Sequence, residues 1–243
     1  MIRGVVVSIL LSLITTASYA QFEASANIQT NHLWRGGEVA DGVVVTTDVA
    51  TTLLGENFRL GVWGGMNTQG SYKEFNYYAT YTLGGLSLAL WDTYNFSDYA
   101  TYNNEEFFNY DAATTGRFLD ATVAYRFGEG FPLRVSWSTV IFGRDRTSDN
   151  SANRYSTFCY AEYPLYNRDL WRLDVGLGGA FAINPCGERA NFYGEQSGIV
   201  HVSMAISRDL VLGSYTLPIT VTTMWNPQSD QAYLQLAARL LSF

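Results

Sequence analysis

Hydrophobic and polar residues alternate along most of this chain with a period of two, the pattern of strands that have one apolar face. In one clear case, Phe58, Leu60 and Val62 fall on one face while Arg59 and Gly61 fall on the other. The same alternation recurs to the end of the chain. It predicts twelve strands, over residues 22–34, 43–54, 58–66, 73–83, 86–96, 117–127, 133–141, 154–165, 170–183, 199–207, 212–225 and 231–243.

The links between these predicted strands alternate between short and long. The short links are 55–57, 84–85, 128–130, 166–169 and 208–211, and the long ones are 36–42, 68–72, 97–116, 143–153, 184–198 and 226–230. A soluble β-sandwich also disperses its apolar residues, but it gives no reason for loops sorted by length. Outer-membrane barrels have short periplasmic turns and long extracellular loops. We therefore expect an all-β fold, a closed antiparallel transmembrane β-barrel of about 12 strands with both termini on the periplasmic side.

Composition and the first residues agree with an exported membrane protein. The chain is 47% hydrophobic and 15% aromatic, yet no run after residue 20 approaches the length of a transmembrane helix. Arg3, an apolar run over residues 5–14 and the small residues Ser18 and Ala20 have the layout of a secretory signal peptide. We expect residues 1–20 to be cleaved, leaving residues 21–243 as one barrel domain in the outer membrane of a Gram-negative bacterium.

Several short motifs in the first third of the chain carry a family resemblance. They are Asn31–Gly36 with its Trp-Arg-Gly, the pair Asp41-Gly42, Leu60–Gly64 with its Gly-x-Trp, and Tyr72–Tyr77 with an acid among aromatics. Over residues 31–96 the chain resembles the TorF-like family of outer-membrane porins. The resemblance implies a channel and does not identify its solute.

The polar face of the predicted strands carries charges of both signs. In a barrel they would line the lumen, either as a transverse field that screens solutes by charge or as ion pairs that hold a filled lumen rigid. Barrels of eight strands are filled by side chains and those of sixteen are open, so twelve strands leave both alternatives standing. The predicted pore-lining residues are Glu23, Asp48, Arg59, Glu74, Asp120, Arg126, Arg134, Arg172, Asp174 and His201.

The long link over residues 97–116 combines aromatic and acidic residues. One interpretation is a constriction loop, in which rings stack on sugars or nucleobases and carboxylates repel anions. The other is a surface loop whose aromatic residues pack on the rim of the barrel. The candidate constriction residues are Tyr99, Tyr102, Glu105, Glu106, Phe107, Phe108, Tyr110 and Asp111. Residues 184–198 are a second candidate cover for the pore. Outward aromatic residues near strand ends, Trp34 and Trp171 among them, are expected to form interfacial girdles.

The chain offers little that points to catalysis or to a cofactor. His201 and Ser203 lie two residues apart, as in some outer-membrane lipid hydrolases, but both fall on the expected lumenal face. The only other histidine is His32, so no metal site and no cofactor are predicted. A net charge of −7 argues against nucleic-acid binding. Cys159 and Cys186 are either a disulfide or two unpaired thiols.

The sequence thus predicts a porin-like channel, not an enzyme, for passive diffusion of small polar solutes. One alternative is a non-conducting barrel that serves as a scaffold or accessory subunit of an envelope complex. A lipid hydrolase is the other. The expected partners are outer-membrane lipid, small polar solutes and, for the scaffold, an envelope protein.

Overall fold

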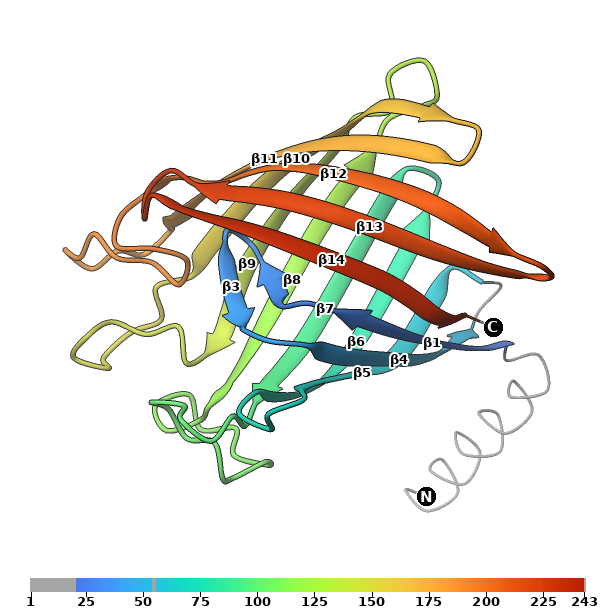
Figure 1. Cartoon of the computed structure of the whole chain (residues 1–243). Helices are drawn as coiled ribbons and strands as arrows, with labels where there is room; N and C mark the ends of the chain where they lie inside the picture. The colour runs from blue at the N-terminus through green and yellow to red at the C-terminus, as the bar shows by residue number, and fades with distance from the viewer. Residues whose placement is uncertain (1–20, 54–55, 243) are drawn as a thin grey trace, which may run out of the picture.

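Twelve antiparallel strands close into a barrel, with a separate two-stranded sheet, β2 and β3, inside the ring (Figure 1). The computed structural model describes residues 21–53 and 56–242, so the predicted signal peptide lies outside the described residues. The predicted fold class is confirmed. The strands are β1 (Gln21–Gln29), β2 (His32–Trp34), β3 (Gly37–Ala40), β4 (Val44–Leu53), β5 (Phe58–Asn67), β6 (Lys73–Leu83), β7 (Leu86–Asn95), β8 (Arg117–Arg126), β9 (Arg134–Gly143), β10 (Ser156–Arg168), β11 (Trp171–Ala182), β12 (Gly198–Leu212), β13 (Tyr215–Asn226) and β14 (Gln231–Ser242).

The first and last strands close the barrel. β1 pairs with β4 on one side and with β14 on the other, so that Ala26 is opposite both Thr47 and Leu241. The register with β14 shifts after this point, because Asn27 pairs with Arg239 and Leu240 is left unmatched. An extra residue in one strand of a pair is a β-bulge. It accounts for the place in β14 where the sequence alternation breaks.

The outer wall is apolar around the whole circumference. Val49, Leu60, Leu90, Leu177 and Leu234 all point outward and are 39–64% exposed. Burying such a wall in water-excluding lipid is favourable, and an outward apolar band with a polar interior is what a bilayer requires of a barrel. Within the described residues no helix is long and apolar enough to cross a membrane.

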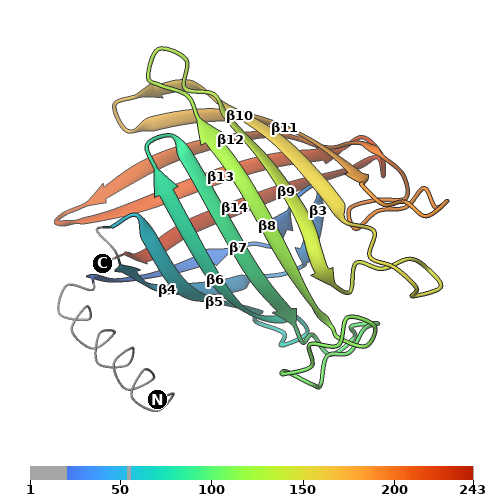
Figure 2. The same cartoon turned by 180° about the vertical axis from the view of Figure 1, so that it is seen from behind.

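The two ends of the barrel differ in their connections, and Figure 2 shows the difference from behind. At one end, called the turn end, the links are residues 54–57, 84–85, 127–133, 169–170 and 213–214. At the other, called the loop end, they are residues 30–43, 68–72, 96–116, 144–155, 183–197 and 227–230. The last turn was expected at residues 208–211 and lies at 213–214, because β12 continues to pair with β13 as far as Leu212 and Tyr215. The β12–β13 hairpin consequently projects beyond its neighbours, and so does the β10–β11 hairpin, in which pairing continues to Arg168 and Trp171 (Figures 1 and 2).

The first predicted strand is wrong in its second half. The chain leaves the wall after Gln29, and residues 32–40 form the β2–β3 hairpin inside the barrel. Arg35 and Gly36 make the tight reversal with φ angles of 44° and 92°. Positive φ costs glycine nothing and is tolerated at a single arginine only where the surroundings hold it. Those surroundings, on the far wall, define the candidate functional site.

Candidate functional site

The tip of the β2–β3 hairpin is fixed to the opposite wall by Arg35. Its guanidinium donates hydrogen bonds to both carboxylate oxygens of Asp120 in β8, at 2.6 and 2.9 Å. It also donates to the hydroxyl of Tyr193, at 2.7 Å, and lies 4.7 Å from the ring centroid of Trp34. A two-pronged arginine–carboxylate pair is strong and fixes orientation. The hairpin therefore crosses the lumen as an ordered element.

Gly36 brings the hairpin backbone against β12 and β13. The side-chain amide of Asn226 donates a hydrogen bond to the Gly36 carbonyl oxygen at 2.9 Å. A Cβ at this position would overlap the carbonyl oxygen of Val200, so the contact needs glycine. Strict alternation with the inward His201 would put Val200 on the lipid face, but a register shift between β11 and β12 places it inside, fully buried.

Aromatic rings hold both sides of the hairpin. Trp34, predicted to lie in an outward girdle, instead packs inside the barrel against Phe118, Phe192 and Tyr193, with centroid distances of 5.5–6.2 Å. The His32 ring lies 5.7 Å from Tyr72 at an interplanar angle of 25° and 5.6 Å from Trp63. The hairpin thus divides the lumen and leaves space on each of its sides.

The larger space is a cavity of about 1200 Å³ between the hairpin and the wall formed by β5 to β9. Ser87, Ala124 and Arg134 line it near the turn end, whereas Gln69 and Tyr99 line it at the loop end. The cavity therefore extends along the barrel from one set of connections to the other. A smaller space of about 250 Å³ lies on the other side of Arg35, next to Asp174, His201 and Ser203.

The predicted pore-lining residues all belong to the inward face, and many are in ion pairs. Arg59 lies 2.7 Å from Asp48 and 3.2 Å from Glu23. Arg172 lies 2.6 Å from Asp174, while Arg126 and Arg172 approach Glu162 at 4.0 and 3.9 Å. The larger cavity is lined by Glu74, Asp120, Arg134 and His201. Ion pairs thus gather at the turn end, and their role in conduction stays a prediction.

The inward residues that the sequence did not single out as site residues include Trp34, Arg35, Arg144 and Glu162. The Trp34-Arg35-Gly36-Gly37 run contains a glycine pair that signals a tight turn. Arg144 lies just beyond β9, where strand alternation gives no face.

The loop over residues 97–116 divides between the two sides of the wall. Phe107 packs against the outward residues Phe75, Tyr77 and Tyr94, with centroid distances of 5.3–6.1 Å. Beneath it the outward Arg117, with no exposed side-chain surface, pairs with Asp92 at 2.8 Å. Asp92, a charged residue on the otherwise apolar outer face of β7, is thereby neutralised outside the barrel.

The other candidate constriction residues are also divided between the outer wall, the solvent-exposed part of the loop and the cavity. Tyr110 donates a hydrogen bond to Asp92 on the outer wall, at 2.6 Å, and Phe108 is 80% exposed. Glu106 accepts hydrogen bonds from two asparagines within the loop, Asp111 accepts one from the Ala113 N–H, and Glu105 is exposed. Only Tyr99 and Tyr102 line the cavity. Phe107, Phe108 and Tyr110 lie outside the lumen and do not narrow it, which corrects the predicted constriction.

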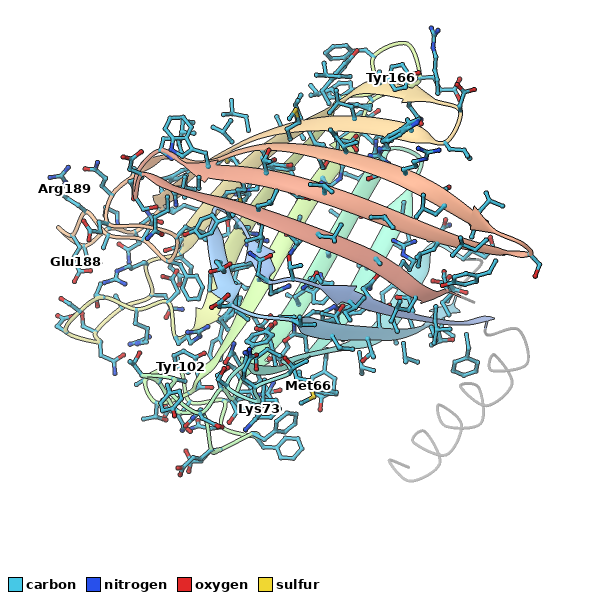
Figure 3. All side chains as sticks on the ribbon, in the orientation of Figure 1. Met66, Lys73, Tyr102, Tyr166, Glu188 and Arg189 are labelled. Carbon is cyan, nitrogen blue, oxygen red and sulfur yellow. The ribbon has the colours of Figure 1, made fainter. Side chains whose placement is uncertain are left out.

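Two neighbouring loops are tied together by Glu188. Its carboxylate accepts hydrogen bonds from the N–H and hydroxyl of Ser148, at 2.7 and 2.6 Å, and from Nε of Arg154 at 2.9 Å. The Ser148 hydrogen bonds, with help from Arg154, lower the pKa of Glu188 to about 2. In Figure 3, Glu188 and Arg189 project from the loop end, well away from Tyr166 at the turn end. The loop over residues 183–197 is therefore joined to residues 144–155, and its role as a cover of the pore stays a prediction.

The residues considered for catalysis or for a disulfide either lie far from each other or lack the hydrogen-bond partner that the chemistry needs. His201 Nε2 is 2.8 Å from the Ser203 hydroxyl, but its Nδ1 has no hydrogen-bond partner among the described residues. A catalytic histidine needs an orienting group at that nitrogen. Cys159 lies on the outward face of β10 and Cys186 in the loop after β11, and the two are not bonded to each other. Among residues 21–53 and 56–242 no group of three or more His, Cys, Asp or Glu side chains could hold a metal ion.

No family model matches the chain, and no curated protein matches it either. Among solved structures, the chain is similar to an outer membrane channel from Pseudomonas putida F1, with 10% sequence identity, a TM-score of 0.42 and coverage of 90% of this chain and 93% of that one. A structure of an engineered protein described for asymmetric conductivity is similar at 6% identity and a TM-score of 0.35, covering 92% of this chain and all of that one (100%). These likenesses are too distant to carry a functional argument, and the TorF-like resemblance stays a prediction.

Proposed function

We propose that the protein is an outer-membrane channel that admits small polar solutes by passive diffusion. The observation that carries this proposal is the cavity of about 1200 Å³, which is lined by residues of both barrel ends. The apolar outer wall supports a membrane location. The signal-peptide pattern of residues 1–20 supports export to the outer membrane of a Gram-negative cell.

The inward hairpin gives this channel its expected size. The solute path runs between the hairpin and β5–β9, so only part of the lumen is open. A narrow path lined by polar and aromatic side chains admits small hydrated solutes and excludes folded or bulky ones.

The decisive experiment is single-channel recording from the refolded mature protein, residues 21–243, in planar bilayers. Discrete conductance steps are expected, well below those of a sixteen-stranded porin. Absence of steps, from protein whose heat-sensitive migration on gels shows that it is folded and whose insertion is verified, would refute the channel.

The hairpin also favours one second candidate, a non-conducting barrel that serves as a scaffold or accessory subunit of an envelope complex. The Arg35–Asp120 pair and the rings around Trp34 fill the centre of the lumen. A folded, inserted and electrically silent barrel would support this candidate.

A further inference from the structure

Arg144 faces the larger cavity at the loop end, and no described residue forms an ion pair with it. Its guanidinium carbon lies 3.7 Å from the ring centroid of Tyr102 and 5.1–5.2 Å from those of Phe118 and Phe192. No carboxylate lies within 4.0 Å of it in the described part of the chain, and its Nε has no hydrogen-bond partner. Arginine is fully charged and offers five N–H donors, so a partly buried guanidinium held only by rings has donors available for an anion.

Burial removes water from the Arg144 guanidinium and so disfavours its charged form, and neighbouring groups of the protein offset this penalty only in part. Desolvation lowers the pKa of Arg144, and the nearby Tyr102, Glu74 and Asp145 act in the opposite direction without cancelling it. Asp145 is already engaged, because its two oxygens accept hydrogen bonds from the Ser156 N–H and hydroxyl, at 2.6 and 2.8 Å. A carboxylate brought by a solute would satisfy the arginine that these groups leave uncompensated.

Glu74 is the complementary residue on the wall of the same cavity. Its carboxylate accepts hydrogen bonds from the side-chain amides of Asn76, at 2.8 Å, and Asn95, at 3.3 Å. These donors are neutral, and among the described residues no lysine or arginine nitrogen lies within 4.0 Å of Glu74. A carboxylate has about four acceptor sites, so Glu74 keeps capacity for an ammonium group.

The remaining charges of the cavity do not favour either sign. Arg35 and Asp120 neutralise each other. Asp41, at the loop end, and Arg134, at the turn end, line the same space and carry opposite charges. A simple anion would meet Glu74 and a simple cation would meet Arg144, whereas a molecule with one charge of each sign meets a partner for both.

We propose that Arg144 and Glu74 form a binding site for a small zwitterionic solute, a molecule that carries one carboxylate and one ammonium group. Arg144 binds the carboxylate, Glu74 binds the ammonium, and the rings of Tyr102 and Trp34 flank the rest of the solute. The inference rests on the proposed channel for its biological meaning, but the site itself is measurable without any current.

The test is equilibrium titration calorimetry on the folded full-length mature barrel in detergent, with three matched probes. L-Phenylalanine carries both charges, 3-phenylpropanoate only the negative one, and 2-phenylethylamine only the positive one. We expect L-phenylalanine to bind about tenfold or more tightly than either analogue, the effect of one charge-assisted hydrogen-bonded contact. Equal affinity for L-phenylalanine and one analogue, or no heat of binding from any probe, would overturn the site.

Variants assign the two ends of the solute. Arg144→Gln and Glu74→Gln should each weaken L-phenylalanine binding by about tenfold or more. Arg134→Gln, in the same cavity but at the turn end, is the control and should leave the affinity unchanged. Arg144→Lys keeps the positive charge but lacks the planar guanidinium that binds a carboxylate through two hydrogen bonds, so it should give an intermediate affinity. This variant still tests the site if Arg144→Gln does not fold. Loss of affinity in the Arg134 variant, or none in the Arg144 and Glu74 variants, contradicts the assignment.

The same proteins in planar bilayers separate this inference from the proposed function. Conductance that persists without L-phenylalanine binding refutes the site and leaves the channel standing. Binding by a barrel that does not conduct refutes the channel and leaves the site standing.

Discussion

Arg35 and Asp120 are joined across the lumen by two hydrogen bonds, although they lie 85 residues apart in the chain. Side-chain exposures of 15% and 4% place the pair largely out of bulk water. Removing one partner of a buried pair leaves an uncompensated charge, which costs about 3–5 kcal/mol. We therefore expect the pair to contribute strongly to holding the hairpin in the lumen.

Asp120→Asn should release the hairpin tip. The substitution keeps the shape of the side chain but takes away the counter-charge of Arg35, so the docked hairpin loses about 3–5 kcal/mol of stability. We expect larger or fluctuating single-channel conductance and faster amide hydrogen exchange over residues 32–40. Unchanged conductance together with unchanged exchange would show that the pair does not hold the hairpin.

Gly36→Ala tests the same docking through the backbone. A methyl group would overlap the Val200 carbonyl oxygen at a residue whose φ is 92°, so the variant should also undock the hairpin. Gly37→Ala is the matched control, because its Cβ would meet only the Trp34 carbonyl oxygen at 3.8 Å. Conductance and exchange over residues 32–40 should change in the first variant and not in the second. An equal change in both would point to a general loss of hairpin structure.

Phe107→Ala should loosen the loop over residues 97–116 without enlarging the pore. The substitution removes the contacts of the Phe107 ring with Phe75, Tyr77 and Tyr94 on the outer wall. The packed loop is thereby destabilised by about 2 kcal/mol or more. Chymotrypsin should then cleave this loop faster in reconstituted vesicles, while single-channel conductance stays the same. Phe108→Ala removes an 80% exposed ring whose centroid lies 4.9 Å from that of Phe107, so it is the comparison variant and should loosen the loop less than Phe107→Ala. A conductance increase in the Phe107 variant would restore the constriction interpretation.

Acid should separate the loops that Glu188 joins. Its pKa is lowered from 4.5 to about 2, so the contact with Ser148 and Arg154 is fully formed above the unfolded value and is lost as the pH falls from about 4.5 through 2. Limited pepsin cleavage within residues 183–197 should rise over that interval. Glu188→Gln should show the raised cleavage already at pH 4.5, and a flat profile in the unmodified protein would contradict the contact.

Cys186 reports which barrel end faces the outside of the cell. It is exposed in the loop over residues 183–197, whereas Cys159 is half-buried on the outward face of β10. A membrane-impermeant maleimide should label intact cells that carry the protein, and Cys186→Ser should abolish that labelling. Labelling that requires cell lysis would place the loop end in the periplasm.

The sequence by itself determined the wall of this protein. Alternation assigned the faces of residues such as Leu60 and Glu74 correctly, because in a barrel each side chain meets either lipid or lumen and the pattern repeats every second residue. The alternation of short and long links gave the twelve-stranded closed ring, since antiparallel neighbours joined in sequence leave little other topology.

Only the tertiary structure decided what enters the lumen and what stays outside it. The alternation of β1 ends at Gln29, because residues 30–32 are all polar and Leu33 and Trp34 are adjacent apolar residues. This break and the glycine pair at 36–37 indicate a turn, but nothing local shows that the chain turns inward. The turn depends on Asp120, Val200 and Asn226, partners that are remote in sequence. The loop that contains Phe107 packs on the outer wall, over the Asp92–Arg117 pair, and these two partners are likewise remote from each other in sequence. A strand's face is set by near neighbours, whereas the place of a hairpin or loop is set by contacts that exist only once the barrel has closed.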